Sequence, residues 1–339
     1  MANLSKFLKH HQLVAYFVLT YILMWVLLFI FQPLYLKGQT WVAPLLSMGI
    51  FAPALVSIGL SSILKPQPKQ ETRKAALISF FVMWILASPI IILYLIVNQE
   101  MELSTRLVIV TTITGMLPAF VCSCVFSRRP GPRDLLRTYI KPRGSFWYYF
   151  LAFSLVPVIW ILGNLLSRVL GTELPFIRSP KVDIKFVEMV ILFFLYNIIY
   201  GGISEEPGWR GFALPRLQAK FSPLVSSLIL GVVWAVWHAP AHFGGIQAQS
   251  LSDTLVQWVL IVLVNIIFTW LFNRTKGSIL VTALIHAAMN TTGNFLTGSL
   301  GALLLLFLFI IFIIIFDKMW RKLPKNHPAL YQESLHEGV

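Results

Sequence analysis

The chain has 339 residues, of which 57% are hydrophobic and only 12% are charged, and its mean hydropathy is +0.77. An average soluble domain is about 45 to 50% apolar and about 25% charged, so this composition excludes an ordinary soluble protein. The net charge of +14 does not indicate a nucleic-acid partner, because the basic residues occupy short segments between apolar runs. We therefore expect an all-α polytopic membrane protein whose surroundings are the lipid bilayer.

Apolar runs follow one another along the whole chain, and each is close to the length of about 20 residues that a membrane-spanning helix needs. They cover residues 13–32, 41–63, 75–97, 106–126, 146–168, 187–204, 223–243, 254–273, 278–296 and 300–317. The first run is long enough to span and has no small-residue cleavage site before Gln32, so we expect no cleavable signal peptide. The pattern predicts about ten transmembrane helices.

Basic residues concentrate in alternate connecting segments, and this alternation predicts which side of the membrane each segment faces. The basic segments are 65–74, 128–143, 210–220, 274–276 and 318–325, and Lys6 and Lys9 precede the first apolar run. The segments between them carry few basic residues, except for 172–185. The positive-inside rule therefore predicts that both termini are cytoplasmic.

A basic segment containing Pro and Gly, residues 128–144, divides the chain into two membrane parts. Residues 1–144 are expected to form a four-helix part of unknown role, and residues 145–317 a six-helix core that holds most of the intramembrane polar residues. Residues 318–339 are expected to be a polar, solvated cytoplasmic tail. Cys122 and Cys124 lie two apart in one apolar run and point to nearly opposite sides of a helix, so we expect packing residues rather than a disulfide or a metal pair.

The stretch from Gly201 to Gly211, GGISEEPGWRG, places two carboxylates and an arginine directly after an apolar run. An ionisable group at bilayer depth costs about 2.5 to 3.5 kcal/mol on translocon scales and usually marks a functional site. Residues four apart share a helix face, so Glu206 is expected to pair with Arg210 while Glu205 points elsewhere. Trp209, four residues after Glu205, would form an apolar wall beside that carboxylate. The alternative is a structural ion pair that closes a helix end.

A second polar cluster, WAVWHAPAH at residues 234–242, lies in the seventh apolar run. His238 and His242 are four apart, but Ala239 stands where the H-E-x-x-H zinc motif needs glutamate and Pro240 interrupts the turn, so that motif is not supported. His238 is the better candidate for a functional residue. The alternative is a histidine that only joins two helices by a hydrogen bond.

A third cluster, GSILVTALIHAAMN at residues 277–290, places His286 and Asn290 on one helical face. Together they offer two hydrogen-bond donors, which is what an oxyanion site requires. Their alternative is again a hydrogen bond between helices.

Three such clusters on three helices favour a catalytic site over three unrelated contacts. Glu205, His238, His286 and Asn290 can activate a water molecule and stabilise a tetrahedral intermediate. Glu205, His238 and His286 are also of the residue types that hold a catalytic zinc ion with one position left for water. The residues therefore favour hydrolysis of an amide, with zinc as a candidate cofactor.

The succession EEPGWRG, WAVWHAP and LIHAAMN resembles three motifs of the CPBP intramembrane proteases, E-E-x-x-x-R, F/W-x-x-x-H and H-x-x-x-N. That family includes CAAX prenyl endopeptidases of the Abi type and bacteriocin-processing or immunity proteins. The resemblance covers residues 186–316 and does not reach the first four helices.

The resemblance implies that Glu205 and His238 activate water and that His286 and Asn290 stabilise the oxyanion. The second glutamate and the arginine of the first motif would support them. It also implies a peptide or protein substrate, with prenylated CAAX termini among the candidates, and we expect an integral protein of a bacterial cell membrane.

Two other functions stay open at this point. A proton-coupled transporter would also use intramembrane Glu and His, although the sequence has no inverted repeat of broken helices. A bacteriocin immunity protein would keep the same residues for recognition without catalysis.

Depth along the helices gives a further expectation. A rise of about 1.5 Å per residue places His286 about 13 Å inside a helix that begins near Gly277, and Glu205 at a similar depth if its helix continues to about Leu214. His238 would lie about 22 Å from a start at Pro223. His238 would then lie too deep unless residues 212–222 form an interfacial piece and the seventh helix is tilted or begins late.

Overall fold

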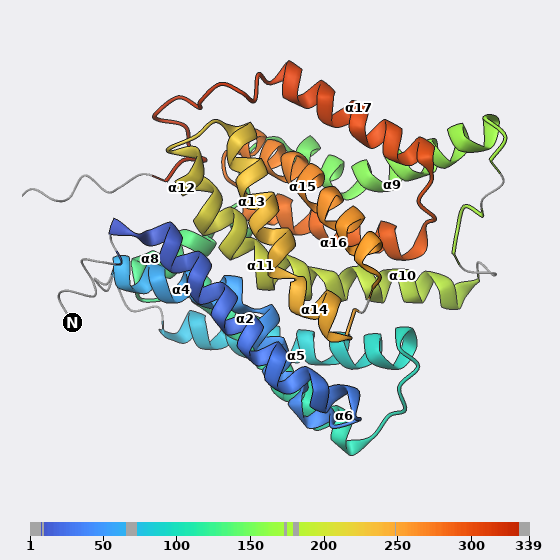
Figure 1. Ribbon diagram of the computed structural model, residues 1–339. Coiled ribbons are helices and arrows are strands. Elements are labelled where there is room, and N and C mark those ends of the chain that lie inside the picture. Colours follow the sequence, from blue (N-terminus) through green and yellow to red (C-terminus); the bar gives the residue numbers. More distant parts are fainter. Residues whose placement is uncertain are drawn as a thin grey trace, which may run out of the picture.

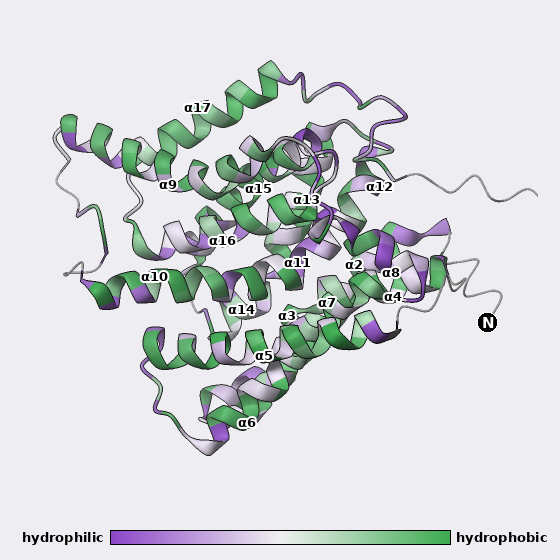
Figure 2. Ribbon diagram, turned by 180° about the vertical axis from the view of Figure 1, so that it is seen from behind, coloured by the Kyte–Doolittle hydropathy of each residue, from purple (hydrophilic) through white to green (hydrophobic). Residues whose placement is uncertain are grey.

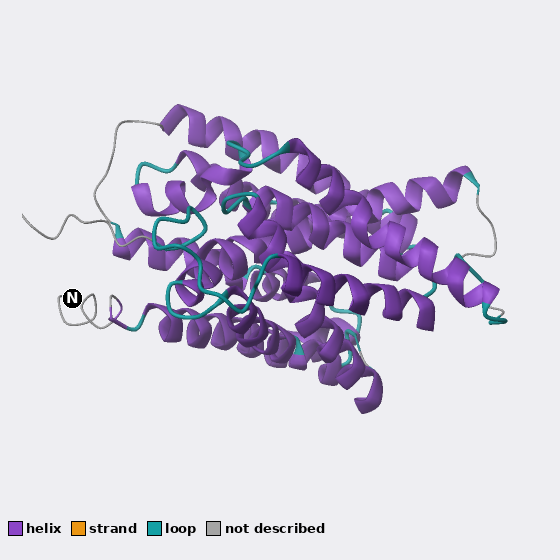
Figure 3. Cartoon of the chain, turned by 90° about the horizontal axis from the view of Figure 1, so that it is seen from above, coloured by secondary structure: helices purple, strands orange, loops and turns teal. Residues whose placement is uncertain are grey.

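The computed structural model describes residues 8, 10–65, 73–172, 175–178, 183–247 and 249–331. Within these ranges every regular element is a helix, apart from one isolated bridge between Ile177 and Leu296 (Figure 3). The predicted all-α class is confirmed. In chain order the elements are α2 (Gln12–Leu36), η1 (Thr40–Val42), α3 (Ala43–Ile50), α4 (Ala52–Leu64), α5 (Arg73–Asn98), α6 (Thr105–Thr114), α7 (Met116–Ser123), η2 (Cys124–Phe126), α8 (Pro130–Leu136), η3 (Arg137–Tyr139), α9 (Phe146–Val169), α10 (Ile184–Asn197), η4 (Ile198–Ile203), α11 (Ser204–Glu206), η5 (Pro207–Ala213), α12 (Leu214–Gln218), α13 (Pro223–Trp237), α14 (Ala239–Gly244), α15 (Leu251–Arg274), α16 (Ile279–Phe295) and α17 (Leu300–Phe316).

Seven of the described helical stretches are long and apolar enough to cross a membrane, and the pair Thr40–Ile50 and Ala52–Leu64, bent by 53°, would be an eighth broken span. Each of the predicted apolar runs contains a helix, but α16 and α17 have only 17 residues each. Most of α16 is buried. Large apolar side chains are exposed on α5, α9 and α17, as contact with lipid requires. Figure 2 shows that these helices consist mainly of hydrophobic residues.

The helical run from α10 to α12 lies between two groups of helices (Figure 1). On one side α5 packs on α10, and α4 packs on α11 and η5; on the other side α16 packs on α10 and η4. α2 packs on α13 and α14, so helices of the N-terminal part contact the segments that carry the first and second polar clusters. The N-terminal part, whose role the sequence left open, is therefore part of the wall around the candidate site.

The C-terminal segment folds back on the helices as far as Tyr331, where a solvated tail was expected. Met319 and Ala329 are buried, with 2% and 1% of their surface exposed, and the backbone N–H of Tyr331 donates to the carbonyl of Pro215 at 3.2 Å. The guanidinium of Arg216 lies 3.7 Å from the centre of the Tyr331 ring. The solvated tail stays a prediction for the segment as a whole, although Met319, Ala329 and Tyr331 contact the helices.

The predicted cytoplasmic location of both termini stays a prediction. Lys6, Lys9, Lys181 and residues 332–339, which bear on it, lie outside the described residues. Cys122 and Cys124 are free thiols, in agreement with the expectation that they do not form a disulfide.

Candidate active site

Two π-helical turns flank the glutamates. η4 precedes and η5 follows the single α-helical turn α11. Pro207, the first residue of η5, has no N–H to donate, and π-helical turns inside α-helices are frequent at functional sites. A Cβ atom at Gly201 in η4 would lie 2.7 Å from Cδ2 of His286. The absence of a side chain at Gly201 therefore lets the imidazole of α16 approach the backbone beside the glutamates.

Glu206 and Arg210 form the buried ion pair that their four-residue spacing predicts. Nη1 of Arg210 donates to Oε1 of Glu206 at 2.8 Å, and both side chains are fully buried. Nη2 of Arg210 donates to Oδ1 of Asn265 in α15 at 2.6 Å, and Nδ2 of Asn265 donates to the carbonyl of Ser227 in α13 at 2.6 Å. The arginine thus joins the glutamate helix to two others.

His286 is the second partner of Glu206. Its Nδ1 lies 2.8 Å from Oε1 of Glu206, and an ionised carboxylate only accepts, so Nδ1 carries the hydrogen. The expected partner of His286 on the same face, Asn290, donates from Nδ2 to Oδ1 of Asn197 in α10 at 2.8 Å. Both predicted oxyanion donors therefore lie on α16 as expected, but each already has a partner.

Glu205 has a different environment from Glu206. Its Oε2 accepts hydrogen bonds from the indole N–H groups of Trp209 at 3.2 Å and Trp234 at 2.6 Å. Its Oε1 has no hydrogen-bond partner in the described part of the chain. Glu205 keeps 5% of its surface exposed whereas Glu206 keeps none. One carboxylate is thus held by its neighbours, and the other keeps one oxygen available.

His238 stands at the end of α13, where α14 begins. Its Nδ1 lies 2.8 Å from the backbone carbonyl of Trp234, which can only accept, so Nδ1 carries the hydrogen and Nε2 of the neutral ring has its lone pair available. Trp234 therefore links the two predicted bases: its side chain holds Glu205 and its backbone holds His238.

The sequence left the depth of His238 relative to Glu205 open. α13 begins at Pro223, as assumed, but the glutamate helix continues to Gln218 instead of ending near Leu214. Glu205 therefore lies roughly 13 residues, or about 20 Å, from the end of its helix, which is close to the depth of about 22 Å for His238.

His242, whose part could not be assigned from the sequence, packs on His238. The two rings are stacked with their centroids 5.7 Å apart. Nδ1 of His242 accepts a hydrogen bond from Nε1 of Trp258 in α15 at 3.1 Å. Trp258 of α15 thus holds His242, and the His242 ring packs against the ring of His238.

With this geometry in hand, comparison with known proteins gives two matches. Residues 187–292 match the family model of the type II CAAX prenyl endopeptidase Rce1-like proteins. The chain is also 25% identical over 222 residues to CAAX prenyl protease 2 of Methanococcus maripaludis, an alignment that covers 60% of this chain and 80% of that relative. Residues 187–292 are thus similar to the CAAX prenyl endopeptidases. The similarity supports a membrane endopeptidase of the CAAX prenyl protease type.

The matched range 187–292 includes the positions of all four predicted catalytic residues, Glu205, His238, His286 and Asn290. It does not include α2 to α9 or the C-terminal segment. The division of the chain at residues 144 and 317 stays a prediction.

The zinc prediction named Glu205, His238 and His286 as ligands. Among the residues that the structure describes, no three His, Cys, Asp or Glu side chains are grouped so that they could hold a metal ion. Oε2 of Glu205 accepts from two indoles, and Nδ1 of each histidine has an oxygen partner. This donor set does not form a ready zinc centre, and we derive no step through a metal.

Sequence reasoning missed Asn265 as a member of the cluster. It also missed that Trp234 contacts both Glu205 and His238. Asn265 is an isolated amide in the apolar run VLVNIIF, and a polar side chain in such a run is a signal for a contact between helices. Trp234 is the first residue of the second family motif. Its position was marked, but its hydrogen bond to Glu205 joins residues 29 apart in the chain and follows only from tertiary packing.

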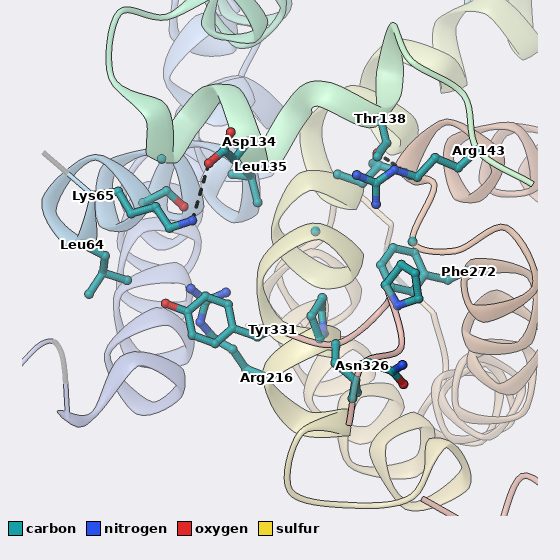
Figure 4. Close-up of a pocket in the computed structure, with 18 residues that line it drawn as sticks. Leu64, Lys65, Asp134, Leu135, Thr138, Arg143, Arg216, Phe272, Asn326 and Tyr331 are labelled. Carbon is teal, nitrogen blue, oxygen red and sulfur yellow. Dashed lines mark hydrogen bonds and ion pairs between the residues drawn. The ribbon is translucent and has the colours of Figure 1, made fainter. Parts of the chain in front are cut away.

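A cavity of about 400 Å³ lies further along the same helical run (Figure 4). Gly211 and Pro215 line it, together with Lys65, Arg143 and Arg216, whereas the predicted site residues do not. In this cavity Lys65 lies 3.5 Å from a carboxylate oxygen of Asp134. The predicted catalytic residues thus lie in the polar cluster around Glu205 and not in this cavity.

Proposed function

We propose that this protein is an intramembrane endopeptidase that hydrolyses a peptide bond with water activated by Glu205 and His238. The observation that carries the proposal is the double contact of Trp234, 2.6 Å to Oε2 of Glu205 and 2.8 Å to Nδ1 of His238. These two hydrogen bonds leave Oε1 of the carboxylate and Nε2 of the imidazole as the basic atoms. Two oriented bases of this kind are suited to general base catalysis, which contributes about 10²- to 10⁴-fold to a rate.

In the proposed reaction the water oxygen attacks the carbonyl carbon of the scissile amide, and its proton passes to Glu205 or His238. The tetrahedral oxyanion accepts hydrogen bonds from the amide of Asn290 and from Nε2–H of His286. The C–N bond then breaks, and the protonated base gives its proton to the leaving nitrogen. Donors of this type are each worth about 10²- to 10³-fold in turnover.

Glu206 and Arg210 have a supporting part in this proposal. Because Nδ1 of His286 donates to Glu206, its Nε2 can donate to an oxyanion only when the ring carries both protons. The Glu206 carboxylate, 2.8 Å from Nδ1, fixes the orientation of the His286 ring, and Arg210 keeps the carboxylate in place.

The proposed substrate is a peptide or protein segment that reaches the site within the membrane. The name of the similar Methanococcus protein, CAAX prenyl protease 2, makes a prenylated CAAX peptide the first substrate to test.

The proposal is tested with purified protein reconstituted in liposomes. We expect the wild type to cleave a prenylated CAAX peptide, with the products identified by mass spectrometry, and His238→Ala to be at least about 100-fold slower because one base is lost. His327→Ala, which changes a histidine of the C-terminal segment, is the matched control and should cleave at the wild-type rate. Undiminished cleavage by His238→Ala would contradict the proposal. Proton-coupled flux without cleavage would favour the transporter.

The glutamate-dependent form of the proposal makes a separate prediction about zinc. A catalytic zinc needs three protein ligands, and the described residues do not group three. We expect elemental analysis of the purified protein to find well below one zinc ion per chain, and a chelator to leave the cleavage rate unchanged. Stoichiometric zinc together with loss of activity in the chelator would replace this mechanism by a metal-dependent one.

A further inference from the structure

Helix α2 donates three side-chain hydrogen bonds to the backbone around His238. They run from Tyr21 Oη to the carbonyl of Val233 at 2.5 Å, from Trp25 Nε1 to the carbonyl of Trp237 at 3.2 Å, and from Gln32 Nε2 to the carbonyl of Pro240 at 3.2 Å. The three donors come from one side of α2, and the three carbonyls lie on one side of the helix pair α13 and α14. The three hydrogen bonds therefore form one continuous contact between α2 and the pair α13 and α14, which we call the α2 seam.

The carbonyl of Trp237 is available because the helix is broken at this point. In an uninterrupted α-helix the carbonyl of Trp237 would accept from the N–H of Ala241. Here the N–H groups of Ala241 and His242 both donate to the carbonyl of His238, at 2.9 and 3.2 Å, and Pro240 has no N–H at all. A buried backbone carbonyl without a partner is costly, so Trp25 of α2 supplies the donor that the broken helix lacks at Trp237.

The same helix also contacts the segment that carries Glu205. Tyr16 of α2 is fully buried and packs edge-on against Trp209, with ring centroids 5.6 Å apart. A Cβ atom at Gly208 would lie 2.2 Å from Oη of Tyr16, so the glycine permits this close approach. Because Trp209 donates to Glu205, α2 touches the supports of both predicted bases.

We propose that Tyr21, Trp25 and Gln32 are positioning residues that set the place of His238 relative to Glu205. The proposal rests on the peptidase function proposed above. It gives a role to the first helix, which lies outside the family match at residues 187–292.

The test compares variants that delete a donor and keep most of the apolar volume. In Tyr21→Phe and Trp25→Phe we expect kcat for the CAAX peptide to fall roughly 10- to 100-fold with KM unchanged, because a small displacement of a catalytic group has effects of this size. The matched control is Trp84→Phe. Nε1 of Trp84 donates to the carbonyl of Thr112 at 2.7 Å, which is the same chemistry between α5 and α6. It should lower thermal stability by a similar amount and leave kcat unchanged.

A second readout does not depend on activity. Hydrogen exchange of the backbone at residues 233–242 should become faster in Tyr21→Phe and Trp25→Phe and stay at the wild-type rate in Trp84→Phe. Wild-type kcat in a folded Tyr21→Phe or Trp25→Phe, or an equal loss of kcat in Trp84→Phe, would overturn the positioning role. If these variants behave as expected but Glu205→Gln cleaves like the wild type, the assigned mechanism fails and the α2 seam does not.

Discussion

Replacing Arg210 with methionine is expected to destabilise the protein by about 3 to 5 kcal/mol, because it breaks a buried ion pair and leaves the other charge behind. The guanidinium is fully buried, donates to Glu206 and Asn265, and lies 4.4 and 4.1 Å from the ring centres of Trp234 and Phe268. Without it the carboxylate of Glu206 keeps a hydrogen bond only from His286 among the described residues. Methionine fills much of the volume but donates nothing.

The measurement is denaturant unfolding in detergent micelles, with Arg274→Met as the matched control. Arg274 pairs with Asp317, but their side chains are 36% and 18% exposed, so the loss of that pair should cost no more than about 1 kcal/mol. Combining Glu206→Gln with Arg210→Met removes both charges and should recover part of the loss. Equal stability of Arg210→Met and Arg274→Met would refute a buried, structurally coupled pair.

Contacts between site residues of the same helix could be predicted from the sequence, whereas contacts between different helices could not. The pairing of Glu206 with Arg210 follows from helix spacing alone, and so does the common face of His286 and Asn290. The contact between Arg210 and Asn265 joins residues 55 apart in the chain, and no periodic pattern indicates it.

The depth of His238 could not be predicted because it depended on where another helix ends. The apolar run 187–204 ends just before Glu205, and its helix was expected to continue only to about Leu214. In the structure α12 extends the helix to Gln218, and two π-helical turns change its geometry on the way. When a membrane helix contains polar residues near one end, the length of its apolar run is shorter than the helix. The end of such a helix cannot be read from the apolar run alone.

The role of α2 could not be predicted either. Its sequence is apolar on all sides and has no clear amphipathic period, so Tyr21, Trp25 and Gln32 do not stand out as a polar face. Their function follows from the broken helix they meet, which lies more than 200 residues later in the chain.

The largest expected effect on activity is that of Glu205→Gln, which should slow cleavage by about 10²- to 10⁴-fold through loss of the general base. Glutamine has the same shape, and its carbonyl oxygen can still accept from the indoles of Trp209 and Trp234. The variant should therefore fold like the wild type. Glu188→Gln is the matched control, because Glu188 is exposed on α10 of the same helical run.

The central claim is that Glu205 activates the attacking water, and its most direct test is the single-turnover cleavage rate of Glu205→Gln beside Glu188→Gln in the same liposomes. We predict that Glu205→Gln binds the prenylated CAAX peptide with wild-type affinity and leaves it intact, while Glu188→Gln cleaves it at the wild-type rate. Cleavage by folded Glu205→Gln at the rate of Glu188→Gln would contradict the claim.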